Sequence, residues 1–136
     1  MRKLILLSVS IFFAQLSIAQ NIFIGKTISD VKDVYYTATK ENFFQGKNKE
    51  TKESFFIIKV MGIDKFRGTF DKEGKCFEHS TEITYKDIPL VKANIKKSGW
   101  TYDEKEEKFL NPTKTIFFQV TKEDKLYYLL CKKITK

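Results

Sequence analysis

Cys76, His79 and Cys131 are the residues whose types could support covalent chemistry, because an imidazole can activate a neighbouring thiol as a nucleophile. Cys76 and His79 are three residues apart in a segment that reads as a strand, so their side chains should point to opposite faces. A single histidine also cannot form the multi-histidine sets of zinc or iron sites. The sequence has no phosphate-binding loop, dinucleotide-binding glycines or nucleophile elbow. We therefore predict no catalytic residue, no metal site, no cofactor and no enzymatic activity.

The N-terminal segment has the layout of a secretory signal peptide. A cationic start is followed by an apolar run from Leu4 to Ala14 and by small residues before a cut after Ala19. The run is shorter than the roughly 20 apolar residues of a membrane-spanning helix. We expect residues 1–19 to be removed, leaving an exported domain over 20–136 with no membrane anchor, in the periplasm or the extracellular space.

The charged residues favour no particular polyanion. The chain carries 25 Lys and Arg against 17 Asp and Glu, a formal net charge of +8. Its lysines are mostly interleaved with acids, as in residues 47–53 and 122–125, which is typical of solvated turns. Since export also separates the chain from the genome, we predict no nucleic-acid partner.

The pair Cys76 and Cys131 has two interpretations. In an oxidising compartment an even number of cysteines favours a disulfide. The alternative is two separate thiols that pack as small hydrophobic residues. The disulfide is our prediction, and it requires the two Cα atoms to approach within about 7 Å.

Apolar periodicity and turn residues predict an α+β domain. A first helix ends near Thr39, with Thr27 and Asp30 as a capping box. Lys40 to Ser54 is predicted as a loop. Strands are expected at 55–61, 65–71 and 75–84, followed by a second helix over 88–98 with Asp87 as its cap, and by strands at 100–103, 108–110, 114–121 and 126–134. The expected architecture is an antiparallel sheet with two helices on one face.

An offset of 60 residues aligns the chain with itself. Thr27 falls on Asp87, and the turn at Asp64-Lys65 falls on Asp124-Lys125. This predicts a tandem α-β-β-β pseudo-repeat, with halves of about 25–84 and 85–136. The element order, together with Gly25-Lys26-Thr27 opening the first helix, resembles the beta-lactamase inhibitor protein fold and the small outer-membrane assembly lipoproteins that share its half-unit. The resemblance implies the fold alone, because no functional motif of those families can be placed on this sequence.

Aromatic doublets in the strands put one ring on each side of the sheet, because neighbouring strand residues alternate. We expect the helix-covered face to take Phe56, Ile58, Val60, Phe66, Phe70, Phe77, His79, Thr81, Ile83, Ile116, Phe118, Val120, Leu126, Tyr128 and Leu130. The other face should carry Phe55, Ile57, Lys59, Arg67, Thr69, Cys76, Phe117, Gln119, Tyr127, Leu129 and Cys131. Its mixture of aromatic, aliphatic and cationic side chains is typical of protein-binding surfaces.

From this second set the sequence predicts a site and two functions. We expect a protein partner to bind Phe55, Ile57, Lys59, Arg67, Phe117, Gln119, Tyr127 and Leu129. The alternative function is a carrier of a small apolar ligand, with a pocket between the sheet and the 40–54 loop. A third reading leaves no binding site, because the same loop or a second copy of the chain covers this face as another core layer.

Overall fold

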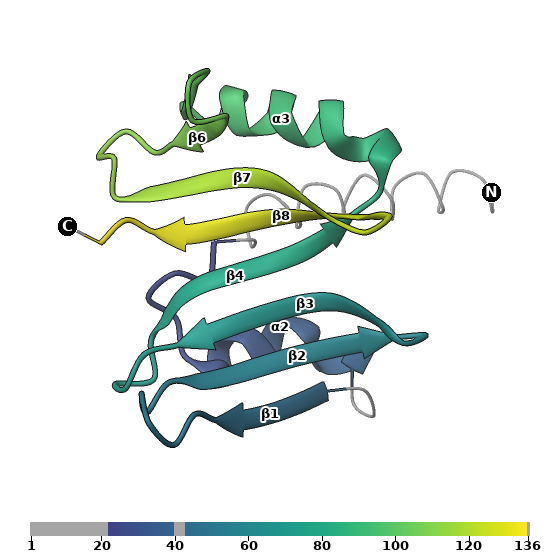
Figure 1. Ribbon diagram of the computed structural model, residues 1–136, viewed down its shortest axis with the longest axis vertical. Helices are drawn as coiled ribbons and strands as arrows, with labels where there is room; N and C mark the ends of the chain where they lie inside the picture. The colour runs from purple at the N-terminus through teal and green to yellow at the C-terminus, as the bar shows by residue number, and fades with distance from the viewer. Residues whose placement is uncertain (1–21, 40–42, 136) are drawn as a thin grey trace.

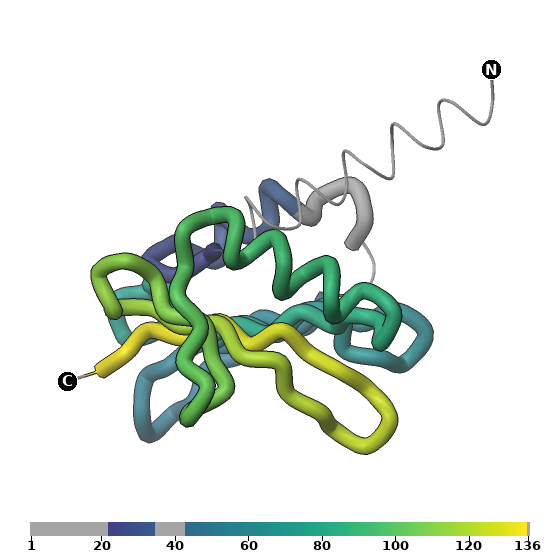
Figure 2. The backbone as a smooth tube through the Cα atoms, turned by 90° about the horizontal axis from the view of Figure 1, so that it is seen from above, coloured from purple at the N-terminus to yellow at the C-terminus, as the bar shows by residue number. Residues whose placement is uncertain are grey.

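One antiparallel sheet of eight strands runs through the described residues, and the two α-helices described lie on the same side of it (Figures 1 and 2). The computed structural model describes residues 22–39 and 43–135. Along the chain the elements are α2 (Ile28–Thr39), β1 (Phe43–Lys47), β2 (Ser54–Val60), β3 (Ile63–Phe70), β4 (Cys76–Ile83), η1 (Tyr85–Asp87), α3 (Ile88–Lys97), β5 (Thr101–Asp103), β6 (Lys108–Leu110), β7 (Ile116–Glu123) and β8 (Leu126–Lys133). The predicted α+β class is confirmed.

The sheet is built from two four-strand meanders joined in the middle. Its strand order is β1-β2-β3-β4-β8-β7-β6-β5, so β4 of the first half pairs antiparallel with β8 of the second. Each half begins with its helix and continues with its four strands. At the offset of 60 the β2–β3 turn, residues 61–62, falls on residues 121–122 inside β7 and not on the β7–β8 turn at 124–125, and these hairpins also hold different places in the two halves. The sequence repeat itself stays a prediction.

The start of α2 is fixed by the predicted capping box. The Thr27 backbone N–H donates to Asp30 Oδ2 at 2.8 Å, and the Asp30 N–H donates to Thr27 Oγ1 at 3.2 Å. The hydrogen bond from the Thr27 backbone, with that from its hydroxyl, lowers the pKa of the Asp30 carboxyl. Two of the backbone N–H groups at this end of the helix are thereby satisfied.

The second helix begins differently. Asp87 is at the N-cap position, but its carboxylate accepts a hydrogen bond from the Thr84 hydroxyl at 2.7 Å instead of capping the helix backbone. Pro89 is in the first turn, where its missing N–H is tolerated, and Gly99 follows the C-cap with φ 88°. The expected helix is therefore present, with a side-chain contact that ties its start to the end of β4.

Each helix covers its own hydrophobic core. Val31 of α2 packs with the buried residues Phe23, Phe56, Ile58, Phe66, Phe70 and Cys76. Ile95 of α3 packs with Phe109, Phe118, Leu129 and Cys131. The two cores therefore lie on one face of the sheet, which we call the covered face.

The N-terminal segment 22–26 connects the two cores. Phe23 is buried in the α2 core, while Ile22 and Ile24 pack against the α3 core. Gly25 N donates to the Cys76 carbonyl and Cys76 N donates to the Lys26 carbonyl, both at 2.8 Å. The segment is thus held to the start of β4 by backbone hydrogen bonds.

The predicted loop over 40–54 is wrong in its central part. Residues 43–47 form β1, which pairs antiparallel with β2 and extends the sheet in its own plane. The order Phe43-Phe44-Gln45-Gly46-Lys47 has two adjacent aromatic residues and no apolar alternation, so it gives little strand signal, and pairing with β2 decides the outcome. Because β1 lies beside β2, it does not cover the face opposite the helices.

Candidate functional site

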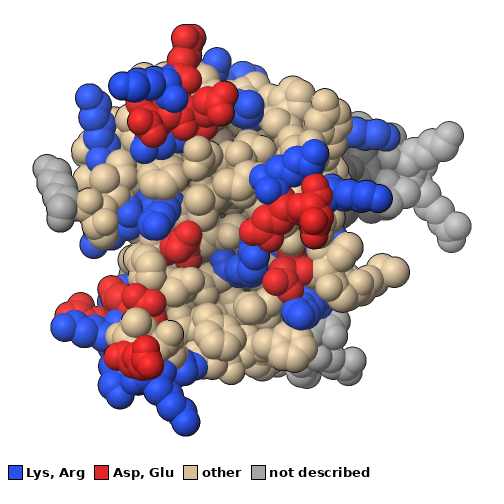
Figure 3. All heavy atoms as spheres, in the orientation of Figure 1, with Lys and Arg blue, Asp and Glu red and all other residues tan. Residues whose placement is uncertain are grey.

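The face of the sheet opposite the helices is the candidate site, and we call it the open face. Cross-strand partners in an antiparallel sheet share a face, so the register identifies its members. They include Phe44, Phe55, Ile57, Lys59, Lys65, Arg67, Thr69, Glu78, Ser80, Glu82, Leu110, Phe117, Gln119, Thr121, Glu123, Tyr128, Leu130 and Lys132. Figure 3 shows this face, with charged clusters separated by uncharged surface.

Arg67 is at the centre of the open face. Its guanidinium carbon lies 4.4 Å from the centroid of the Tyr128 ring, and its Nη2 donates to Glu123 Oε1 at 2.8 Å. Burial alone would lower the pKa of the Arg67 guanidinium, but the hydrogen bond and charge of Glu123 raise it above its ordinary value. The Arg67 Nε is buried without a hydrogen-bond partner. The stack on Tyr128 and the bond to Glu123 hold Arg67 in one geometry and leave a donor unused.

Two further ion pairs lie near Arg67. Lys65 contacts Glu82 in a close ion pair across the β3–β4 pairing. Lys59 Nζ is 3.8 Å from Asp64 Oδ1 and 5.5 Å from the centroid of Phe44. The charges of the central open face are therefore mostly paired, and their aliphatic stems cover neighbouring apolar surface.

Aromatic side chains flank this polar centre on both sides. Phe44 and Phe55 are exposed on the β1–β2 side, by 54% and 40%. On the β6–β7 side, Lys108 Nζ lies 4.8 Å from the centroid of Phe117. Gln119 Nε2 donates to the Glu106 carbonyl at 3.2 Å, which ties β7 to the β5–β6 turn. The open face thus has two aromatic regions with a charged row between them.

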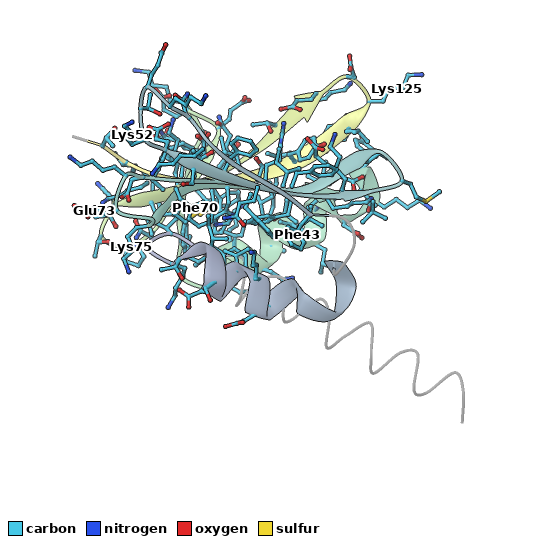
Figure 4. The ribbon with its side chains drawn as sticks, turned by 90° about the horizontal axis from the view of Figure 1, so that it is seen from below. Phe43, Lys52, Phe70, Glu73, Lys75 and Lys125 are labelled. Carbon is cyan, nitrogen blue, oxygen red and sulfur yellow. The ribbon has the colours of Figure 1, made fainter. Side chains whose placement is uncertain are left out.

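Two turns rise above the open face. Figure 4 shows Lys52 and Lys125 on the side away from α2, near opposite ends of the sheet, while Phe43 and Phe70 point toward α2. Lys52 belongs to the β1–β2 turn and Lys125 to the β7–β8 turn. Both turns contain acids as well as lysines, so their tips are mixed in charge.

Six of the eight predicted binding residues are on the open face: Phe55, Ile57, Lys59, Arg67, Phe117 and Gln119. The positions of Tyr127 and Leu129 were predicted wrongly. Tyr127 pairs with Ile83 and Leu129 with Thr81, and Leu129 belongs to the α3 core. Leu126, Tyr128 and Leu130, predicted for the covered face, are on the open face instead.

The length of the β7–β8 turn explains this inversion. Glu123 pairs with Leu126 across a two-residue turn, so every even-numbered residue of β7 faces an odd-numbered residue of β8. The prediction assigned even-numbered residues of both strands to one face. The β2–β3 hairpin also has a two-residue turn, but a register shift beside Ile58 restores the even-with-even pairing, so its predicted faces are confirmed.

Cys76 and Cys131 are both on the covered face, whereas the sequence predicted both of them on the opposite face. A register shift between Thr69 and Phe70 leaves Phe77 as an extra residue in β4, so Cys76 turns toward α2. Cys131 pairs directly with His79, three residues from Cys76. At about 3.3 Å per residue, this offset alone separates the Cα atoms of Cys76 and Cys131 by about 8–10 Å along the strands. That is beyond the Cα–Cα distance of about 7 Å that a disulfide allows. Both are free thiols in the structure, so the predicted disulfide is not formed in it.

Burial makes both thiols poor nucleophiles. It raises the pKa of Cys76 to about 12 and raises that of Cys131 further. Cys76 Sγ contacts the Glu78 carbonyl at 3.5 Å. The neutral thiol is therefore the dominant form of both cysteines at neutral pH.

His79 is a buried structural residue on the covered face. Its Nε2 accepts a hydrogen bond from the Phe23 backbone N–H at 3.1 Å, and its ring stacks on Phe66 at 5.8 Å. Nδ1 therefore carries the proton and is buried without a hydrogen-bond partner. Burial lowers the pKa of His79 to about 3. The imidazole is neutral under ordinary conditions and acts as an acceptor for the N-terminal segment.

A cleft of about 420 Å³ opens at the end of the sheet where β4 begins. Ile24, Phe77 and Ile116 form its apolar wall, and Glu53, Asp71, Lys75 and Lys133 contribute charges to its lining. It is not the pocket predicted between the sheet and the 40–54 segment, because β1 is in the plane of the sheet.

Comparison with protein-family models, with curated proteins and with solved structures finds no match to this chain. Over the described residues, helices long and apolar enough to cross a membrane are not found. The same residues contain no cluster of three or more His, Cys, Asp or Glu side chains that could hold a metal ion. The open face and the cleft are therefore the features of the structure from which a function can be inferred.

Proposed function

We propose that this chain is a non-catalytic binding module that holds a protein partner on the open face. The observation that carries the proposal is the one-sided placement of the helices, which leaves Phe44 and Phe55 exposed on a wide sheet surface. Exposed aromatic groups around a central arginine have the composition of protein-binding hot spots. The signal-peptide layout of residues 1–19 supports a role for the module after export, in the periplasm or the extracellular space.

Arg67 is the expected anchor of the interface. Its ring stack and its bond to Glu123 fix its position before a partner arrives, which reduces the entropy lost on binding. The Arg67 side chain is 31% exposed, so a partner can contact the exposed part of its guanidinium, although not the buried Nε. Phe117 and Phe55, on either side, supply apolar area that becomes buried when the partner binds.

Two aromatic residues of the β7–β8 hairpin on opposite faces of the sheet give a matched test. The purified protein is immobilised and incubated with an extract of exported proteins, in parallel with Phe117→Ala and Tyr127→Ala. Phe117 is on the open face, whereas Tyr127 contacts Tyr85 on the covered face at 5.5 Å between ring centroids. We expect Phe117→Ala to lose the captured partner and Tyr127→Ala to retain it. Equal capture by all three proteins would contradict the proposal.

The cleft near Cys76 favours a second candidate function, the binding of a small apolar ligand. Its volume of about 420 Å³ is within the range of small-molecule sites. The test is the fluorescence of an apolar dye with the purified protein and with Ile116→Trp, which fills part of the cleft. Dye binding that is lost in Ile116→Trp but kept in Phe117→Ala would support this carrier function, and binding unaffected by Ile116→Trp would exclude the cleft.

A further inference from the structure

The two edges of the sheet differ in how well they are protected. β5 has three residues, ends at Asp103 and is followed by a turn with three glutamates. β1 has five residues, Phe-Phe-Gln-Gly-Lys, with one charge. Among the described residues no strand lies beyond either edge, and Figure 1 shows β1 as the outermost element of its half. An edge strand of this length and composition is a template for another strand.

Exposed aromatic rings are concentrated at the β1 edge. Phe43 is 42% exposed and faces the side of α2, where Lys32 Nζ is 4.9 Å from its ring centroid. Phe44 is 54% exposed on the open face, close to Phe55 of β2. A strand that pairs with β1 would therefore bury apolar area on both faces of the sheet at once.

We propose that β1 pairs antiparallel with β1 of a second copy of this chain, about a two-fold axis that passes midway between the two Gln45 residues. This register sets Gln45 opposite Gln45 of the second copy, Phe43 opposite Lys47, and Phe44 opposite Gly46. The arrangement joins the two sheets into one continuous sheet with all helices on the same side. The dimer interface shares Phe44 and Phe55 with the open face proposed as a binding site, but self-pairing needs no other protein.

Self-pairing fits the side chains of β1 in this register. Gly46 has no side chain, and the Phe55 ring already lies over it, because a Cβ on Gly46 would be 2.3 Å from Phe55 Cζ. Phe44 of the second copy therefore meets a glycine backed by an aromatic ring, a favourable cross-strand pair. On the other face, Lys47 of one copy is opposite Phe43 of the other and its aliphatic stem packs on the ring. Lys32 Nζ already lies 4.9 Å from that ring, so the two cations repel each other and this pair adds little to the association.

The chain already uses this mode of association once. Its two meanders meet edge to edge through the antiparallel pair β4–β8, with both helices on one face. The β1 interface is smaller, since five residues and two rings per copy bury less area than a stable dimer requires. We therefore expect weak, reversible association, with a dissociation constant of roughly 10–500 µM.

Cysteine cross-linking tests the register directly. In the proposed dimer the two Gln45 Cα atoms are about 4.5–5.5 Å apart, whereas the two Lys47 Cα atoms are about 14 Å apart. Mild oxidation should convert Gln45→Cys to a covalent dimer and leave Lys47→Cys mostly monomeric. Native Cys76 and Cys131 are buried, so the unmodified protein is the blank. Equal cross-linking of both variants, or of neither, would overturn the proposal.

Sedimentation equilibrium tests the association without a cross-link. We expect the unmodified protein to dimerise reversibly and Phe44→Lys to dimerise at least about tenfold more weakly, because it removes an aromatic contact and adds charge to the edge. Thr101→Lys, at the β5 edge, is the matched control and should dimerise normally. Circular dichroism confirms that each variant is folded. A protein that stays monomeric up to about 1 mM would refute self-pairing and leave the β1 edge to a strand of another protein.

Discussion

Phe55 and Phe56 are adjacent and identical, yet they belong to different environments. Phe56 is fully buried between the sheet and α2, and Phe55 is 40% exposed on the open face. Phe117 and Phe118 repeat the contrast in the second half, where Phe118 is buried under α3 and Phe117 is partly exposed. A strand turns successive side chains to opposite faces, so one doublet supplies both a core residue and a surface residue.

The two faces are also covered by different means. The covered face is closed by two helices and by the segment 22–26. The open face is shielded partly by its own long side chains, with Arg67 over Tyr128 and Lys108 over Phe117. The first kind of cover is fixed by packing, whereas the second can be displaced by a partner. The comparison therefore separates the part of the sheet that stabilises the fold from the part available for binding.

The largest effect should come from truncating the buried ring of the Phe55-Phe56 doublet. Phe56→Ala should reduce the free energy of unfolding by about 3–5 kcal/mol, because it removes a fully buried ring and leaves a cavity. Phe55→Ala should cost at most about 1 kcal/mol, since much of that ring is in water. Urea denaturation of both variants measures the difference. Equal losses would mean that the two faces contribute alike to stability.

Acid should weaken the covered face through His79. Its folded pKa of about 3 is below its ordinary value of 6.5. Below pH 6.5, His79 of the unfolded chain therefore binds a proton, whereas His79 of the folded chain stays neutral until about pH 3. The free energy of unfolding falls across this window, with a contribution from His79 of about 3 kcal/mol by pH 4.

A variant without a titrating ring isolates this contribution. His79→Gln keeps an acceptor for the Phe23 N–H but does not titrate. Chemical denaturation at several pH values from 7 to 4 should show a steeper loss for the unmodified protein than for the variant. Parallel pH profiles would show that His79 does not govern the acid sensitivity.

The open face should tolerate the loss of its central cation. Arg67→Ala should cost about 1 kcal/mol, because Glu123 is exposed and the remaining stabilisation comes from the stack on Tyr128. Arg67→Met retains much of the apolar contact and should cost less. Thermal unfolding of both variants, at low and high salt, separates the contribution of the ion pair with Glu123 from that of the stack on Tyr128. A loss as large as that of Phe56→Ala would remove the distinction between the faces.

The smallest effect is expected at the periphery of the open face. Lys59 Nζ is 3.8 Å from Asp64 Oδ1, and both side chains are partly in water. Lys59→Ala should change the free energy of unfolding by only a few tenths of a kcal/mol, roughly 0.2–0.5. Denaturant titration against the unmodified protein checks this value, and a change above about 1 kcal/mol would indicate a structural role for this ion pair.

Most of the local structure could be predicted from the sequence, because it depends on neighbouring residues. The Thr27–Asp30 capping box and the Pro89-to-Gly99 helix are local signals, and both are confirmed. The face of a residue depends instead on the number of residues in each turn and bulge. One extra residue at Phe77 moves Cys76 to the other face, and the two-residue turn after Glu123 does the same to Tyr127 and Leu129.

Non-local pairing accounts for what the sequence could not indicate. β1 is a strand because it pairs with the edge of β2, and no periodicity within Phe43–Lys47 predicts a strand. The separation of Cys76 from Cys131 follows from the β4–β8 register, which sets Cys131 opposite His79. The composition predicted for the open face was nevertheless largely correct, because an aromatic doublet supplies one ring to each face whichever way it turns.

The attachment of Phe23 to His79 also bears on the order in which a growing chain can fold. The hydrogen bond joins residues 56 positions apart, and the backbone hydrogen bonds of Cys76 to Gly25 and Lys26 span 51 and 50 positions. A ribosome makes Ile22, Phe23 and Ile24 long before β4, and the α3 core that covers Ile22 and Ile24 later still. The hairpins β2–β3 and β3–β4 can close as soon as they emerge, since their contacts are local. Among the described residues, the first to be synthesised are thus among the last to reach their native contacts.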